Sequence, residues 1–83
     1  MPEEHKIKLS SKYFDDVKSG KKSFEIRKND RNYRVNDILI MQEYTESGEY
    51  TGKYIDAVII YMLEDGSYLK DGYVALGIEV LMT

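Results

Sequence analysis

The 83 residues include no cysteine, no tryptophan, one proline and one histidine. Without cysteine the chain has no thiol nucleophile, disulfide or thiolate zinc site, and such a chain fits a reducing compartment. The single histidine, His5, excludes a multi-histidine metal site, and a serine triad would have to be built on it. We expect no metal and no other cofactor, and a structural role for His5.

Long apolar runs are also missing. No segment approaches the roughly 20 apolar residues that cross a bilayer, and the opening residues MPEEHKIK lack the apolar core of a secretion signal. A chain of this length is predicted to form one domain over residues 1–83 with a single small core. We therefore expect a cytoplasmic protein without a membrane partner.

The charge is unevenly distributed along the chain, although the net charge is only −3. Residues 1–34 carry ten basic and six acidic residues, a net charge of +4, and the remainder carries two lysines against nine acids, a net charge of −7. A polyanion would meet a local basic patch and be repelled elsewhere. This pattern argues against non-specific coating of DNA.

The first half of the chain predicts a strand followed by a helix. The strand covers His5 to Leu9, and Ser10 or Ser11 can cap the helix by accepting a backbone N–H. Gly20 is placed to end it, because glycine accepts the left-handed backbone that follows a helix. The helix is expected to pack through Leu9, Tyr13, Phe14 and Val17.

After Gly20 the apolar period changes from 3.6 to two. Residues 22–28 alternate as a strand does, with Phe24 and Ile26 predicted to face the core. A turn is expected at residues 29–32. The next strand, residues 38–41, is apolar on both faces and is predicted to be central, with Asn36 tolerating positive φ in its entry turn.

The second half predicts a hairpin with its loop at residues 46–49, a long strand, a loop from Glu64 to Gly72 and a closing strand. Alternation assigns core faces to both strands: Ile55, Ala57, Ile59, Tyr61 and Leu63 on the first, and Val74, Leu76, Ile78 and Val80 on the second. About five strands and one helix, without a repeated βαβ unit, favour a strand-dominated α+β fold: a small, partly closed mixed β-barrel.

The segment from Gly20 to Arg27 is the strongest candidate for a site. Glu25 and Arg27 are two apart on a strand, so they share a face and lie about 6.5 to 7 Å apart along it. The planar donor fork of arginine suits a phosphate or a base edge, and a carboxylate can hold it in place. Lys22 can turn toward the same point. The plainer alternative is a surface Glu–Arg pair worth under about 1 kcal/mol.

Gly20, Lys22, Glu25 and Arg27 match the GxKxxExR signature of the ASCH superfamily. Later blocks extend the resemblance to nearly the whole chain, which is similar to a family of small, uncharacterised ASCH-like bacterial and phage proteins; Asn36 stands where a glycine is expected. The extended resemblance rests on residues 24–31, 37–40, 43–44, 50–52 and 72–74. It implies a PUA-like β-barrel with the helix beside a cleft, and binding of RNA, often single-stranded or modified.

On this resemblance Lys22 and Arg27 would contact phosphate or base, and Glu25 would orient them. The cleft would be edged by Asn29, Asp30 and Arg31. Unpaired bases are read on aromatic faces, and the candidates for stacking are Tyr13, Tyr33 and Tyr44. Each of these rings has half-buried packing as its alternative role.

Two other functions stay open. Some ASCH-superfamily members resemble amidohydrolases that act on acetylated cytidine, but their motif has a threonine where this chain has Glu25, so the expected nucleophile is missing. A small hydrolase would have to use Lys22 and Glu25 for acid–base chemistry. The third possibility is a protein-interaction module, which requires an exposed apolar patch.

Overall fold

The computed structural model describes residues 2–81, and these form five strands and one short helix. In chain order the elements are β1 (Glu4–Ser10), α1 (Ser11–Lys18), β2 (Phe24–Lys28), β3 (Ile38–Tyr44), β4 (Tyr50–Leu63) and β5 (Tyr73–Val80). The strands form one sheet in the order β1-β3-β4-β5-β2, in which β1 and β3 are parallel and the other pairs antiparallel. The predicted strand-dominated α+β fold is confirmed.

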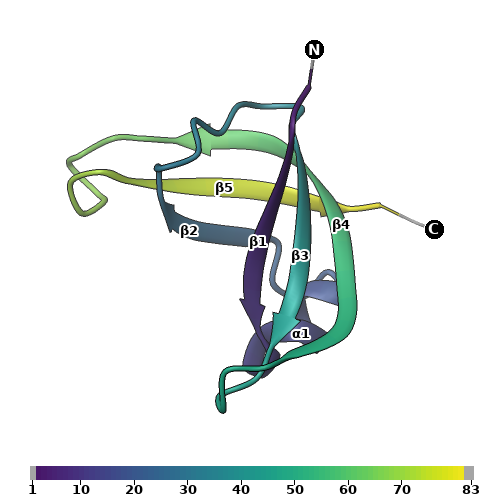
Figure 1. Ribbon diagram of the computed structural model, residues 1–83. Coiled ribbons are helices and arrows are strands. Elements are labelled where there is room, and N and C mark those ends of the chain that lie inside the picture. Colours follow the sequence, from purple (N-terminus) through teal and green to yellow (C-terminus); the bar gives the residue numbers. More distant parts are fainter. Residues whose placement is uncertain (1, 82–83) are drawn as a thin grey trace.

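The sheet curls into a half-barrel. In Figure 1, β1, β3 and the first half of β4 run crosswise to β5, β2 and the second half of β4. The long strand β4 belongs to both parts and carries a register shift between Ile59 and Tyr61. Within residues 2–81, β1 and β2 are the two edges of the sheet, and an arginine on β2 reaches the backbone of β1. We call the opening between these two edges the seam.

The helix begins and ends as the sequence predicts. The Ser10 side chain accepts a hydrogen bond from the Lys12 N–H at 3.2 Å, and Gly20 follows the helix with φ of +83°. Phe14 and Val17 are buried in the core. The prediction that Tyr13 packs in the core is wrong: Tyr13 is 41% exposed, because it borders the seam.

The core lies on the inner face of the curled sheet. Its residues on β4 and β5 include the predicted Ile55, Ala57, Ile59, Val74, Leu76 and Ile78. The central position of β3 is also confirmed, as is the positive φ at Asn36, +80°. Residues 64–72 form the predicted loop.

The predicted face of β2 is wrong. Phe24 and Ile26 are 50% and 55% exposed, whereas Glu25 is only 5% exposed. Antiparallel pairing with β5 sets Glu25 opposite Leu76, whose side chain is in the core, so Glu25 must share that inner face. The strand therefore turns Glu25 inward and its two apolar residues outward.

The second half of β4 also departs from the prediction. The register shift between Ile59 and Tyr61 adds one residue to the strand, and one added residue exchanges the two faces. Tyr61 and Leu63 consequently point outward and are exposed, while Met62 packs against the core.

A buried polar cluster fixes the turn before β3 against β1. The Asp37 carboxylate is 2.8 Å from Nε2 of His5 and accepts hydrogen bonds from the backbone N–H groups of Glu3, at 3.0 Å, and Arg34, at 3.1 Å. Burial acts to raise the pKa of Asp37, but the hydrogen bonds from His5, Glu3 and Arg34 outweigh it and hold the pKa below its usual value. His5 thus has a structural partner.

Replacing Asp37 by asparagine is expected to lower the free energy of unfolding at pH 7 by about 1 to 3 kcal/mol, because buried donors lose a charged acceptor. Since the native pKa of Asp37 is lowered, its contribution is complete above about pH 4 and is lost as the pH falls through the native value. Urea unfolding at pH 7 and about pH 3 should show the gap between wild type and Asp37→Asn narrowing in acid. Asp71→Asn, at an exposed position, is the control. Equal stabilities of wild type and Asp37→Asn at pH 7 would contradict a stabilising role for the Asp37 carboxylate.

Candidate functional site

A polar groove lies along the seam. It has a volume of about 480 Å³ and draws its walls from both sheet edges and from α1. The lining residues are Lys8, Leu9, Ser10, Tyr13, Lys22, Phe24, Glu25, Ile26 and Arg27. This volume falls within the range of small-molecule sites. We call it the seam groove.

Three charged side chains of the predicted motif meet in the seam groove. Nζ of Lys22 lies 2.9 Å from Oε1 of Glu25, and Nε of Arg27 lies 3.0 Å from Oε2 of the same carboxylate. We call these three residues the triad. The proximity that strand spacing predicts for Glu25 and Arg27, and the turn of Lys22 toward them, are both confirmed. The triad carries a net charge of +1.

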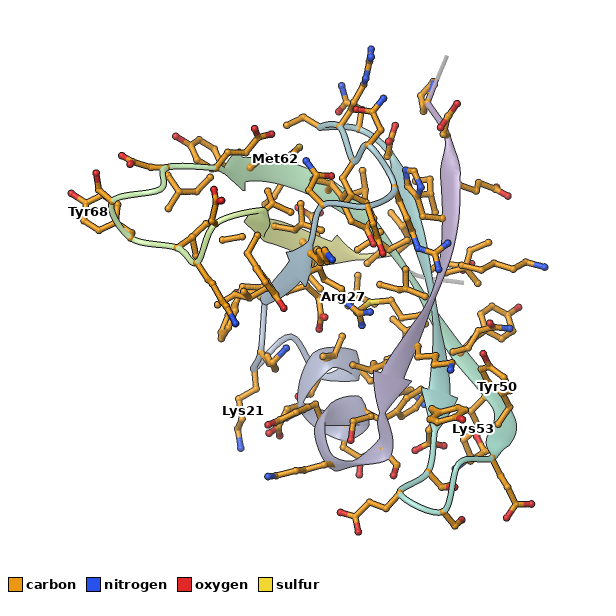
Figure 2. The ribbon with its side chains drawn as sticks, turned by 60° about the vertical axis from the view of Figure 1, so that its left-hand side comes forward. Lys21, Arg27, Tyr50, Lys53, Met62 and Tyr68 are labelled. Carbon is orange, nitrogen blue, oxygen red and sulfur yellow. The ribbon has the colours of Figure 1, made fainter. Side chains whose placement is uncertain are left out.

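Backbone contacts hold the two cations in place. Lys22 also donates from Nζ to the Phe24 carbonyl at 3.0 Å, and Nη2 of Arg27 donates to the Lys8 carbonyl of β1. Figure 2 shows the Arg27 side chain in the space between β2 and β1. Arg27 therefore connects two strands that are not paired with each other, and the groove forms around this connection.

The triad leaves hydrogen-bond donors for a ligand. An ammonium group has three N–H donors and a guanidinium group five. Within residues 2–81, one donor of Lys22 and three of Arg27 remain without a protein acceptor. Several donors on a cluster of net positive charge suit an anion with planar or tetrahedral oxygens, such as a phosphate.

Two aromatic rings flank Lys22. Its Nζ lies 5.2 Å from the ring centroid of Tyr13 and 4.9 Å from that of Phe24, and both rings are exposed. Tyr13 was a predicted stacking residue. Phe24 was missed, because the rule that apolar residues face the core placed it inside, although the alternation with Glu25 and Arg27 had shown that it lies on the opposite face.

The other predicted site residues lie outside the lining of the seam groove. Asn29 accepts from the Tyr33 N–H at 3.2 Å, and the Asp30 N–H donates to the Lys28 carbonyl at 2.9 Å, so both shape the turn after β2. Arg31 is exposed beside them. These three residues belong to the turn and do not border the groove, contrary to the prediction.

Two of the predicted stacking residues lie elsewhere. Tyr33 is 3% exposed and packs edge-on against His5 with ring centroids 4.9 Å apart, so stacking at Tyr33 is a wrong prediction. Burial raises the pKa of the Tyr33 hydroxyl, and the positive charges of Arg27 and Arg31 act in the opposite direction. Tyr44 does not line the groove and holds Lys8 Nζ 4.4 Å from its ring centroid.

A second hollow of about 480 Å³ lies beside Phe14, Tyr54 and Leu81. Among residues 2–81, no hydrogen-bonded charged cluster lines it, so the chemistry favours the seam groove. The same residues contain no group of three or more side chains arranged to hold a metal ion. No helix in this part of the chain has the length and apolar character needed to cross a membrane.

Comparison with known proteins identifies relatives but no activity. A family model described as a domain of unknown function, DUF3850, matches residues 4–78, a span that includes the triad. The chain is 44% identical over 72 residues to an uncharacterised 12.9 kDa protein in the GpA 3′ region of Escherichia phage P2. That match covers 87% of this chain and 64% of the phage protein, so the chain spans less than two thirds of the length of this relative.

Proposed function

The chain belongs to the DUF3850 family of domains of unknown function, and we propose that it binds single-stranded or modified RNA, or a nucleotide, in the seam groove. The observation that carries the proposal is the triad, in which a buried carboxylate fixes two cations whose remaining donors border the groove. The proposal takes up the role implied by the resemblance to the ASCH superfamily.

The way β2 folds supports a functional reading of the triad. Turning Glu25 inward exposes two large apolar residues, Phe24 and Ile26, which opposes the usual burial of such residues. Burying an ion cluster also contributes little net stability, because desolvation offsets the attraction between the charges. Violations of local folding rules concentrate at functional sites. A role in binding explains both features.

The groove combines the two elements that recognise a single strand. Lys22 and Arg27 suit one phosphodiester group, which carries a single negative charge and matches the net charge of the triad. Tyr13 and Phe24 offer exposed rings close to Lys22 for an unpaired base, and such stacking is worth about 1 to 3 kcal/mol per base. Bases in a duplex are already stacked and paired, so we expect single strands to bind more tightly.

The geometry favours binding over hydrolysis. Both carboxylate oxygens of Glu25 already accept from cations, so Glu25 serves to orient Lys22 and Arg27. A hydrolase would need Glu25 to take a proton from water, in competition with the two cations that it already holds.

The test of the proposal is fluorescence anisotropy of a short labelled single-stranded RNA titrated with the protein at two salt concentrations. We expect saturable binding. The logarithm of the association constant should fall with the logarithm of the salt concentration with a slope near −1, because one or two phosphates are neutralised and each contributes about 0.7 to the slope. A duplex of the same sequence is the control and should bind more weakly. Absence of saturable binding at low salt would contradict simple RNA recognition.

A further inference from the structure

The outer side of the sheet carries apolar side chains that nothing within residues 2–81 covers. Phe24 and Ile26 extend outward from β2, and Tyr61, 68% exposed, and Leu63 extend outward from β4. Between them runs β5, whose residues at this level are Ala75 and Gly77. We call these six residues the outer apolar face. Contiguous exposed apolar groups of this kind mark interaction sites.

The strand register places large and small residues side by side on this face. Phe24 and Tyr61 both pair with Gly77, and Ile26 and Leu63 both pair with Ala75. Each large residue of β2 therefore has a small residue beside it on β5. Adjacent strands lie about 4.8 Å apart, so a raised row and a shallow trough run side by side along the sheet.

We propose that the outer apolar face binds a second copy of the chain in a twofold dimer. A twofold axis that runs parallel to the strands, midway between β2 and β5, lays β2 of each copy over β5 of the other. Phe24 then lies over Gly77 of the partner, and Ile26 lies over Ala75 of the partner. A twofold interface must be self-complementary, and the neighbouring large and small residues satisfy this in both directions at once.

Charge at the ends of the face agrees with this arrangement. The register that pairs Phe24 with Gly77 brings Lys22 to the level of Glu79, and both residues border one hollow. Exchange of β2 and β5 by the axis therefore sets Glu79 of one copy beside the segment that leads into β2 of the other, where Lys21 is exposed. This meeting of opposite charges favours a second copy as the occupant.

The face is small compared with a standard interface, which uses about 20 to 30 residues on each side. A weak dimer follows, with a dissociation constant on the order of 10 to 100 μM. This face shares Phe24 and Ile26 with the lining of the seam groove, but the test does not depend on RNA binding, because it measures the mass of the particle in the absence of any ligand.

Sedimentation velocity of the full chain from about 5 to about 500 μM, a range that brackets this constant, tests the proposal. Wild type should change from monomer to dimer and form nothing larger. Ile26→Glu should remain monomeric, because a charge would be buried against Ala75 of the partner. The control is Tyr54→Ser, which removes an exposed ring from the part of β4 paired with β3 and should dimerise as wild type does.

Ala75→Phe separates a shaped interface from general stickiness. This substitution enlarges the apolar surface but fills the trough that receives Ile26, so we expect dimerisation to weaken by at least about tenfold. Circular dichroism confirms that each variant is folded. A wild type that is monomeric throughout, dimerisation by Ala75→Phe as strong as or stronger than wild type, or growth beyond the dimer would overturn the proposal.

Discussion

Replacing Arg27 by alanine is expected to weaken binding of a short single-stranded RNA by about 10- to 100-fold, because charge-assisted hydrogen bonds are worth about 1.5 to 3 kcal/mol. The substitution removes the three free donors of the guanidinium and the connection from Nη2 to the Lys8 carbonyl of β1. Arg27→Lys should recover only part of the affinity, since an ammonium group cannot keep Glu25 and Lys8 as partners and also present a planar fork.

The matched control is Arg31→Ala. Arg31 is an exposed arginine four residues further along the chain and does not line the seam groove. Arg31→Ala changes the net charge by the same amount as Arg27→Ala. We therefore expect RNA affinity to fall by less than about threefold, because only the long-range electrostatic attraction is weakened. Equal losses for the two variants would mean that RNA responds to overall charge and not to the groove.

The second large effect concerns the stability of the triad. Glu25→Leu is expected to lower the free energy of unfolding by about 2 kcal/mol, because Lys22 and Arg27 lose their buried partner. This expected loss is smaller than the loss for a fully buried ion pair, because both cations are partly exposed and can be rehydrated. Urea unfolding measures the change.

A triple variant separates folding from binding. Lys22→Met, Glu25→Leu and Arg27→Met together replace the triad with apolar side chains of similar length, and such exchanges of buried ion clusters are often neutral or stabilising. We expect the triple variant to unfold at the same urea concentration as Glu25→Leu or at a higher one, and to bind no RNA. A triple variant less stable than Glu25→Leu would mean that the triad serves mainly to hold the fold together.

Much of the fold follows from local chemistry. Ser10 as a helix cap, Gly20 after the helix and Asn36 at positive φ each reflect a backbone preference of one residue type, and all three hold in the structure. The alternation of β5 also predicts its buried face, because its outward residues are small or polar and leave no competing apolar side.

The errors in assigning buried faces arose in strands where either face could be buried. In β2 the apolar pair Phe24 and Ile26 competes with the charged residue Glu25, and pairing with β5 together with the two cations decides in favour of burying Glu25. In β4 the added residue near Tyr61 exchanges the faces. Neither pairing nor a bulge can be identified from alternation within one strand.

The candidate site was predictable in part for the same reason. Lys22, Glu25 and Arg27 lie within six residues of one another, so strand spacing suffices to bring them together. The contribution of β1 was not predictable, because the Lys8 carbonyl is 19 residues away from Arg27 and meets it only when the sheet curls. The residues that follow directly in sequence, 29–31, are carried away from the groove by the turn.

The most direct test of the central claim is an NMR titration of isotopically labelled protein with a short single-stranded RNA. Amide shifts should concentrate at residues 8–10 and 22–27, which line the seam groove. Tyr50 and Tyr54, whose exposed rings are on β4 and do not line the groove, should show little change. Shifts confined to those tyrosines, or no shifts at saturating RNA, would contradict the account.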